Sequence, residues 1–184
     1  MDKELKNDLL ILSRRVLENE LYHSNHDLSE FDIPEFEEDR GLFVTLHIKG
    51  KLRGCIGRLE ARNSIYRNVI ELSKAAAFED HRFKNLTSKE LPDVRIEISL
   101  LTKPELVKGD SSVEKVMKIK PKKDGVIISS GSRNATFLPQ VWDSLPIRED
   151  FISDLCRKAG LTPDYWQHYD LEVSTYRVEH FEEE

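Results

Sequence analysis

The sequence has no long hydrophobic run and few cysteines. No stretch approaches the roughly 20 consecutive apolar residues that a membrane-spanning helix requires, and the first ten residues, MDKELKNDLL, carry acids where a signal peptide would be continuously apolar. The two cysteines, Cys55 and Cys156, are too few for a disulfide framework. Cys156 lies on the apolar stripe of a predicted helix, which favours a packing role. We therefore expect a soluble cytoplasmic protein with reduced thiols.

Several well-known functional motifs are also missing. The sequence contains no G-x-x-x-x-G-K-[ST], G-x-G-x-x-G, G-x-S-x-G, H-E-x-x-H or paired C-x-x-C. This disfavours P-loop nucleotide hydrolysis, Rossmann redox chemistry, serine hydrolysis and a structural zinc. His23 and His26 lie in an acidic loop. They could belong to a metal site, but no further His or Cys accompanies them and a solvated loop is favoured. We assign no metal, and the sequence leaves any cofactor unknown.

The chain also lacks an excess of positive charge. Its net charge is −6, and residues 1–40 hold 5 Lys/Arg against 12 Asp/Glu. Such a balance makes nucleic acid an unlikely partner. Lys118, Lys120, Lys122 and Lys123 form one local basic cluster. It could bind phosphate, although a solvated loop is favoured because no aromatic or Gly-rich cradle accompanies the lysines.

What the sequence does contain is a clear order of periodic segments. The predicted elements are a helix over 3–21, a hairpin over 41–58, a helix over 65–78, a capped turn at 88–91, a strand over 94–101, a hairpin over 124–138, a helix over 149–159, a turn at 163–166 and a strand over 170–178. The order predicts an α+β fold with two related β-β-α-α-β repeats. We expect these repeats to form one curved, barrel-like, mainly antiparallel sheet with helices packed outside.

The 184 residues, of which 39% are hydrophobic, are enough for one compact domain with a sizeable core. We expect a single domain over 1–184, divided into an N-terminal helix and acidic loop over 1–40, a first repeat over 41–101, a connection over 102–123 and a second repeat over 124–178.

The strand that carries Cys55 is the strongest candidate for chemistry. Side chains alternate along a strand, so Arg53 and Cys55 are expected on one face, and a nearby cation favours the thiolate form of a cysteine. A nucleophilic thiol also needs an oriented partner, which His47, Asp80 or His81 could supply. Alternatively, a small thiol between glycines simply fills a tight space in the core. Packing is the favoured reading, and the catalytic reading stays open.

Two arginines could bind an anionic substrate. Arg53 and Arg82 can each make bidentate contacts to an anion, or they can pair with acids and tie the repeats together. Gln140 could present its amide to the same pocket or satisfy loose backbone groups. The candidate catalytic residues are Cys55 and Arg53, and the candidate pocket-lining residues are Gly54, Gly57, Asp80, Arg82, Glu97, Asp124 and Gln140.

The stretch Leu52–Gly57, LRGCIG, resembles the signature hexapeptide of the AMMECR domain family. Further matching stretches are Gly41–Thr45, Ala76–Phe78 with Asp80, Arg82 and Phe83, Glu90–Pro92, Ile96–Ser99, Asp124–Val126, Phe137–Trp142 and Leu155–Leu161. The resemblance covers nearly the whole chain and implies an α+β fold with two repeats around a barrel-like sheet. Arg58 and His81 depart from the residues found in many relatives, which puts any ligand contact there in doubt.

The biochemical function of this family is not established. The resemblance implies an association with a radical SAM protein and a Memo-like protein, because prokaryotic members are often encoded or fused with them. We therefore expect an enzyme or enzyme component with a small-molecule pocket around the strand Arg53-Gly54-Cys55. The alternative is a non-catalytic adaptor that binds one of those partners. A homo-oligomer is compatible with both, and the sequence specifies neither substrate nor reaction.

Overall fold

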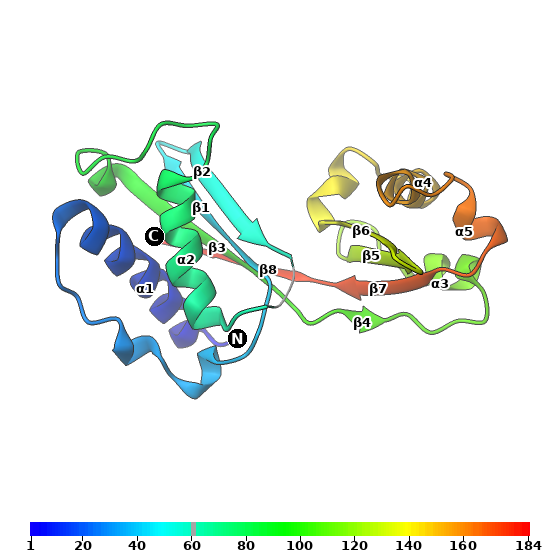
Figure 1. Cartoon of the computed structure of the whole chain (residues 1–184), viewed down its shortest axis with the longest axis horizontal. Coiled ribbons are helices and arrows are strands. Elements are labelled where there is room, and N and C mark those ends of the chain that lie inside the picture. Colours follow the sequence, from blue (N-terminus) through cyan, green and yellow to red (C-terminus); the bar gives the residue numbers. More distant parts are fainter. Residues whose placement is uncertain (60–61) are drawn as a thin grey trace. The chain divides into compact units, whose positions relative to one another are not determined.

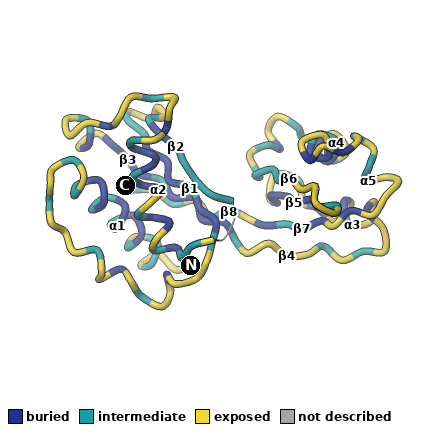
Figure 2. Tube along the Cα trace, viewed as in Figure 1, coloured by how far each residue is buried: buried dark blue, intermediate teal, exposed yellow. Residues whose placement is uncertain are grey.

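The computed structural model describes residues 1–59 and 62–184. The chain forms two compact units, one of Met1–Leu101 with Glu179–Glu184 and one of Thr102–Val178. Each unit has its own sheet, and buried residues gather where helices meet strands (Figures 1 and 2). Among the described residues, no helix is both long enough and apolar enough to cross a membrane.

The first unit packs two helices on one face of a four-stranded sheet. Its elements are α1 (Lys3–Tyr22), η1 (Ser29–Phe31), η2 (Pro34–Phe36), β1 (Leu42–Ile48), β2 (Lys51–Arg58), α2 (Ile65–Phe78), η3 (Leu91–Asp93), β3 (Val94–Leu101) and β8 (Val178–Glu182). The strand order is β2-β1-β3-β8, and β1 is antiparallel to both β2 and β3. The helices α1 and α2 lie side by side against this sheet (Figure 1). Asp2 and Ser64 cap their first turns through side-chain oxygens.

The alternation of apolar residues decides which face of this sheet is covered. Val44 and Leu46 of β1, with Ile96 and Ile98 of β3, are fully buried against the apolar stripes of both helices. The intervening residues therefore point to the opposite face. Gly54 lies on the helix side, where a Cβ atom would come within 2.1 Å of the Ala76 carbonyl oxygen. Only glycine lets β2 approach α2 so closely.

The second unit has a separate sheet and core. Its elements are β4 (Glu105–Leu106), α3 (Ser112–Lys118), β5 (Gly125–Ser130), β6 (Arg133–Phe137), η4 (Pro139–Asp143), α4 (Arg148–Lys158), α5 (Tyr165–His168) and β7 (Glu172–Tyr176). The strand order is β4-β7-β5-β6. Trp142 is fully buried, stacks on Phe151 with ring centroids 3.7 Å apart, and donates from Nε1 to the Asp124 carbonyl oxygen. The buried Cys156 belongs to this core, as its position in the apolar stripe predicted.

The prediction of one barrel-like sheet is wrong. The described residues form an α+β fold with two antiparallel four-stranded sheets and no closed barrel. The two hairpins, β1–β2 and β5–β6, pair with different third strands. The strand expected over 170–178 also divides: β7 ends at Tyr176 beside β5, whereas β8 starts at Val178 and joins β3.

Both sheets place the first hairpin strand between its hairpin partner and the strand after the helix, as β2-β1-β3 and β6-β5-β7. This common order does not confirm a duplication. The duplication, and the single-domain organisation over 1–184, stay predictions.

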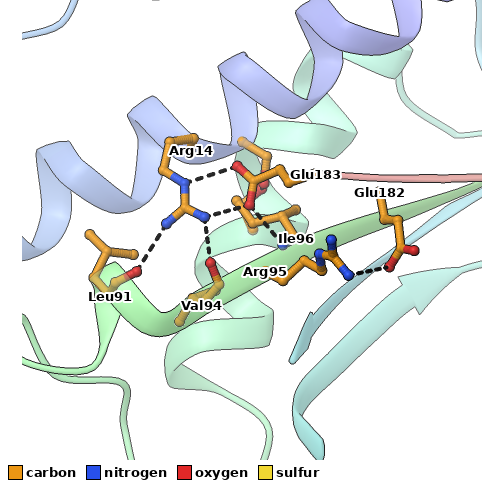
Figure 3. A network of polar contacts seen from close by, with 9 residues as sticks. Arg14, Leu91, Val94, Arg95, Ile96, Glu182 and Glu183 are labelled. Carbon is orange, nitrogen blue, oxygen red and sulfur yellow. Dashed lines mark hydrogen bonds and ion pairs between the residues drawn. The ribbon is translucent and has the colours of Figure 1, made fainter. Parts of the chain in front are cut away.

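A network around Arg14 joins α1 to the end of the chain (Figure 3). The Arg14 guanidinium binds both carboxylate oxygens of Glu183, with Nε 2.9 Å from Oε1, and also donates to the Leu91 and Val94 carbonyl oxygens at 3.1 and 2.7 Å. Glu183 Oε2 accepts from the Ile96 amide at 2.9 Å. One arginine therefore holds η3, β3 and the residues after β8 together.

Replacing Arg14 by Met should destabilise the protein by about 2 kcal/mol, because the half-buried Glu183 carboxylate and two carbonyl groups lose the donors that Arg14 supplies. Urea unfolding at neutral pH measures this loss. Arg95→Met is the matched control. Within residues 1–59 and 62–184, the one ion pair that Arg95 makes is an exposed contact of 4.0 Å with Glu182, so this variant should cost less than about 0.5 kcal/mol. Equal losses in the two variants would contradict the role given to Arg14.

Candidate functional site

Cys55 lies on the edge strand of the first sheet, on the face away from α1 and α2. In the strand pairing it stands opposite Thr45, and Thr45 stands opposite Glu97. These three side chains therefore share one face in a row across β2, β1 and β3. Thr45 Oγ1 donates to the Cys55 sulfur at 3.2 Å. The sulfur of this half-buried residue thus has a defined position beside a hydroxyl group.

The backbone of Cys55 is held by two side chains from the turn after α2. Because β2 is an edge strand, the outward N–H and C=O groups of Cys55 have no neighbouring strand. The Cys55 amide donates to Asp80 Oδ2 at 2.9 Å, and Arg82 Nη2 donates to the Cys55 carbonyl oxygen at 3.2 Å. Asp80 and Arg82 therefore satisfy the groups that another strand would otherwise bind.

Asp80 and Arg82 also bind each other. Arg82 Nε and Nη2 lie 2.9 and 2.7 Å from the two Asp80 carboxylate oxygens. These hydrogen bonds hold the pKa of the buried Asp80 carboxyl far below its usual value; the Cys55 amide adds to the effect, and burial opposes it. The pKa of Arg82 is raised, chiefly by the hydrogen bonds to Asp80 and in small part by the nearby Cys55 sulfur. Arg82 thus places a cation against the backbone of the residue that carries the thiol, 3.2 Å from its carbonyl oxygen.

Arg53 lies at an irregularity of the hairpin and is held by the segment before β3. The pairing of β1 with β2 shifts between Leu46 and His47, so Arg53 falls at a bulge. Its guanidinium binds both oxygens of Glu90, at 3.0 and 3.2 Å, and donates to the Lys84 and Asn85 carbonyl oxygens. These contacts fasten β2 to the segment before β3 and use Arg53 for structure.

A polar group that sequence reasoning missed lies farther along the same face. His180 of β8 places Nδ1 2.9 Å from Ser99 Oγ and 3.6 Å from Glu97 Oε1. Glu97, His180, Phe181 and Glu182 line a hollow of about 340 Å³. Both short contacts involve the same nitrogen of His180, so the group lacks the geometry of a Ser-His-Glu triad. The apolar residues Val178 and Phe181 are three positions apart, so no apolar period of two marks β8 and the sequence carries no clear signal of this group.

The remaining candidates lie in other surroundings. Gly57 packs against the Phe43 ring, where a Cβ would come within 2.1 Å. Asp124 and Gln140 belong to the second unit, with Asp124 buried and Gln140 exposed in η4.

The histidines considered for chemistry or metal binding are also dispersed. His81 is exposed in the turn between Asp80 and Arg82, and His47 lies two residues from Thr45 on β1. His26 pairs with Glu18 at 2.9 Å, while the exposed His23 ends α1. Within residues 1–59 and 62–184, no group of three His, Cys, Asp or Glu side chains is arranged to hold a metal ion.

The fold and this site describe an α+β protein whose most distinctive feature is a positioned thiol on a sheet edge. The sequence model of the AMMECR1 family matches residues 10–181, and the chain therefore belongs to the AMMECR1 family. The family expected from the LRGCIG stretch is thus confirmed.

Relatives and a solved structure agree with this assignment. A protein of Methanothermobacter thermautotrophicus is 37% identical over 177 residues, covering 93% of this chain and 89% of the relative. Protein MJ0810 of Methanocaldococcus jannaschii is 37% identical over 179 residues, covering 93% and 86%. The crystal structure of the uncharacterised protein PH0010 from Pyrococcus horikoshii is similar with a TM-score of 0.77 and 34% identity, covering 100% of this chain and 94% of that one.

Glu90→Gln should lower stability at neutral pH by about 1 kcal/mol, after discounting for an exposure of 35%. Arg53 lowers the pKa of Glu90 from 4.5 to about 2, with Thr87 assisting and burial opposing. A carboxyl whose pKa is lower in the folded state stabilises the fold above its unfolded pKa and loses this contribution as the pH falls through the folded value.

The measurement is urea unfolding of wild type and variant at pH of about 7 and about 2.5. The difference between the two proteins should shrink at the lower pH. Glu71→Gln serves as the control, because Glu71 is 48% exposed in its pair with Arg58. A difference for Glu90→Gln that is independent of pH would rule out the ion pair as its source.

Proposed function

We propose that the protein is an enzyme, or a component of one, that binds a small anionic molecule beside Cys55 and uses this thiol as nucleophile or ligand. The observation that carries the proposal is the defined position of the sulfur. Thr45 Oγ1 contacts it at 3.2 Å, and Asp80 and Arg82 hold the backbone of the same residue. A thiol that only fills space needs no such positioning.

The contrast with Cys156 supports the choice of thiol. Cys156 is fully buried in the core of the second unit, and burial raises the pKa of its thiol. A reactive cysteine needs both access and a positive environment. Cys55 is half-buried, and the Arg82 guanidinium binds its carbonyl oxygen at 3.2 Å.

Arg82 supplies the reason to expect an anion. Its side chain is 59% exposed, although Nε and Nη2 bind Asp80. Its Nη1 makes no hydrogen bond to any part of the chain that the structure describes. A fixed guanidinium with a free donor is suited to a carboxylate or phosphate group. The Arg53 guanidinium, by contrast, donates to Glu90 and to two carbonyl oxygens.

The proposal is tested by comparing an anionic and a neutral alkylating reagent in a Cys156→Ser background. Cys55 should react in the native protein, and the ratio of the iodoacetate rate to the iodoacetamide rate should fall about threefold in Arg82→Gln. Arg58→Gln, on the same strand but paired with Glu71, should leave the ratio unchanged. Mass spectrometry of the modified peptide gives both rates.

Complete protection of Cys55 in the native protein would contradict the proposal, as would an unchanged ratio in Arg82→Gln. Circular dichroism of each variant separates loss of charge from loss of fold. The alternative is an adaptor that binds a radical SAM or Memo-like protein. It predicts instead that Cys55→Ser leaves the binding of that partner intact.

A further inference from the structure

A polar hollow of about 470 Å³ lies in the second unit, where the end of α3, the start of β4 and the end of β7 meet. Three cationic residues line it: Lys118, Lys120 and Arg177. All four lysines of the basic cluster are exposed, as expected of a solvated loop, but they do not share one environment. Two of its lysines, Lys118 and Lys120, are joined in this hollow by an arginine from more than 50 positions farther along the chain.

The positions of the cations are set by buried and paired groups. Asp124, which is 6% exposed, accepts from the Lys120 amide at 2.9 Å and lies 3.6 Å from Arg177 Nε. Thr102 Oγ1 accepts from the Arg177 amide at 2.8 Å. Asp124 therefore orients the guanidinium, and Thr102 fixes the backbone that carries it.

Several donors in the hollow remain available. Lys120 Nζ and Thr175 Oγ1 make no hydrogen bond or ion pair within residues 1–59 and 62–184, and Arg177 is 58% exposed. Lys118 Nζ is already held by the Lys108 carbonyl oxygen and Glu114, so it contributes charge more than hydrogen bonds. An ammonium, a guanidinium and a hydroxyl around one space match the oxygens of a phosphate group.

We propose that this hollow binds the phosphate group of a small phosphorylated molecule. Its volume falls in the usual range for small-ligand sites, about 300–1,000 Å³. Lys120 and Arg177 contact the phosphate oxygens, and Thr175 donates from the floor. Glu105 also lines the hollow and accepts a hydrogen bond from a hydroxyl or amino group of the ligand. The site lies in a different unit from Cys55, so this proposal is independent of the proposed function and is tested separately from it.

Pyrophosphate serves as the probe. Because Lys120 and Glu105 carry opposite charges, neutralising one or the other should change the affinity for pyrophosphate in opposite directions. Titration of the full chain, followed by amide NMR, should shift the signals of Thr102, Thr175 and Arg177. Lys120→Gln should weaken binding about fivefold, whereas Glu105→Gln should strengthen it by removing repulsion. Lys122→Gln is the matched control, since Lys122 is exposed like Lys120 but does not line the hollow. It should have little effect.

Equal weakening by Lys120→Gln and Lys122→Gln would overturn the proposal, because it would indicate a diffuse attraction of anions to a basic loop. Shifts confined to residues 120–123 would overturn it as well. Each variant must retain the unfolding midpoint of the wild type, so that a loss of binding can be attributed to the changed hollow and not to unfolding.

Discussion

The bidentate contact between Arg14 and Glu183 determines how the first unit is completed. Arg14 comes from the first helix and Glu183 from the last residues of the chain, and the same carboxylate accepts from the Ile96 amide of β3. Because half-buried charges need full pairing, this contact holds the end of the chain against β3. It thereby keeps β8 in the sheet, and with it His180 beside Glu97 and Ser99.

The environment of Cys55 follows from a second constraint, which is the free edge of β2. An edge strand must satisfy or protect its outward backbone groups, and here Asp80 and Arg82 do so at Cys55. The same contacts hold a guanidinium at the backbone of the residue that carries the thiol. A structural requirement of the sheet edge therefore also creates the charge on which the proposed chemistry depends. The two roles are compatible because Arg82 uses only part of its donor set.

Much of the fold is readable from periodicity and capping. The helix expected over 65–78 is α2, the strand expected over 94–101 is β3, and the hairpin over 41–58 contains β1 and β2. The candidate site is only partly readable. Asp80 and Arg82 do lie at Cys55, but Arg53 has no partner residue on β1, because the register of the hairpin shifts there, and its guanidinium binds Glu90. A bulge depends on how two strands pair, so it cannot be predicted from the sequence of one strand alone.

The sequence by itself determined the family, through the LRGCIG stretch and its companions, and the secondary structure, through apolar periods of two and 3.6 residues. The tertiary structure decided that the strands form two sheets, that the segment over 170–178 divides near Arg177, and that Arg82 is the cation beside Cys55. The reason is physical: periodicity reports which face of an element is buried, whereas strand partners and ion pairs depend on residues far apart in the chain.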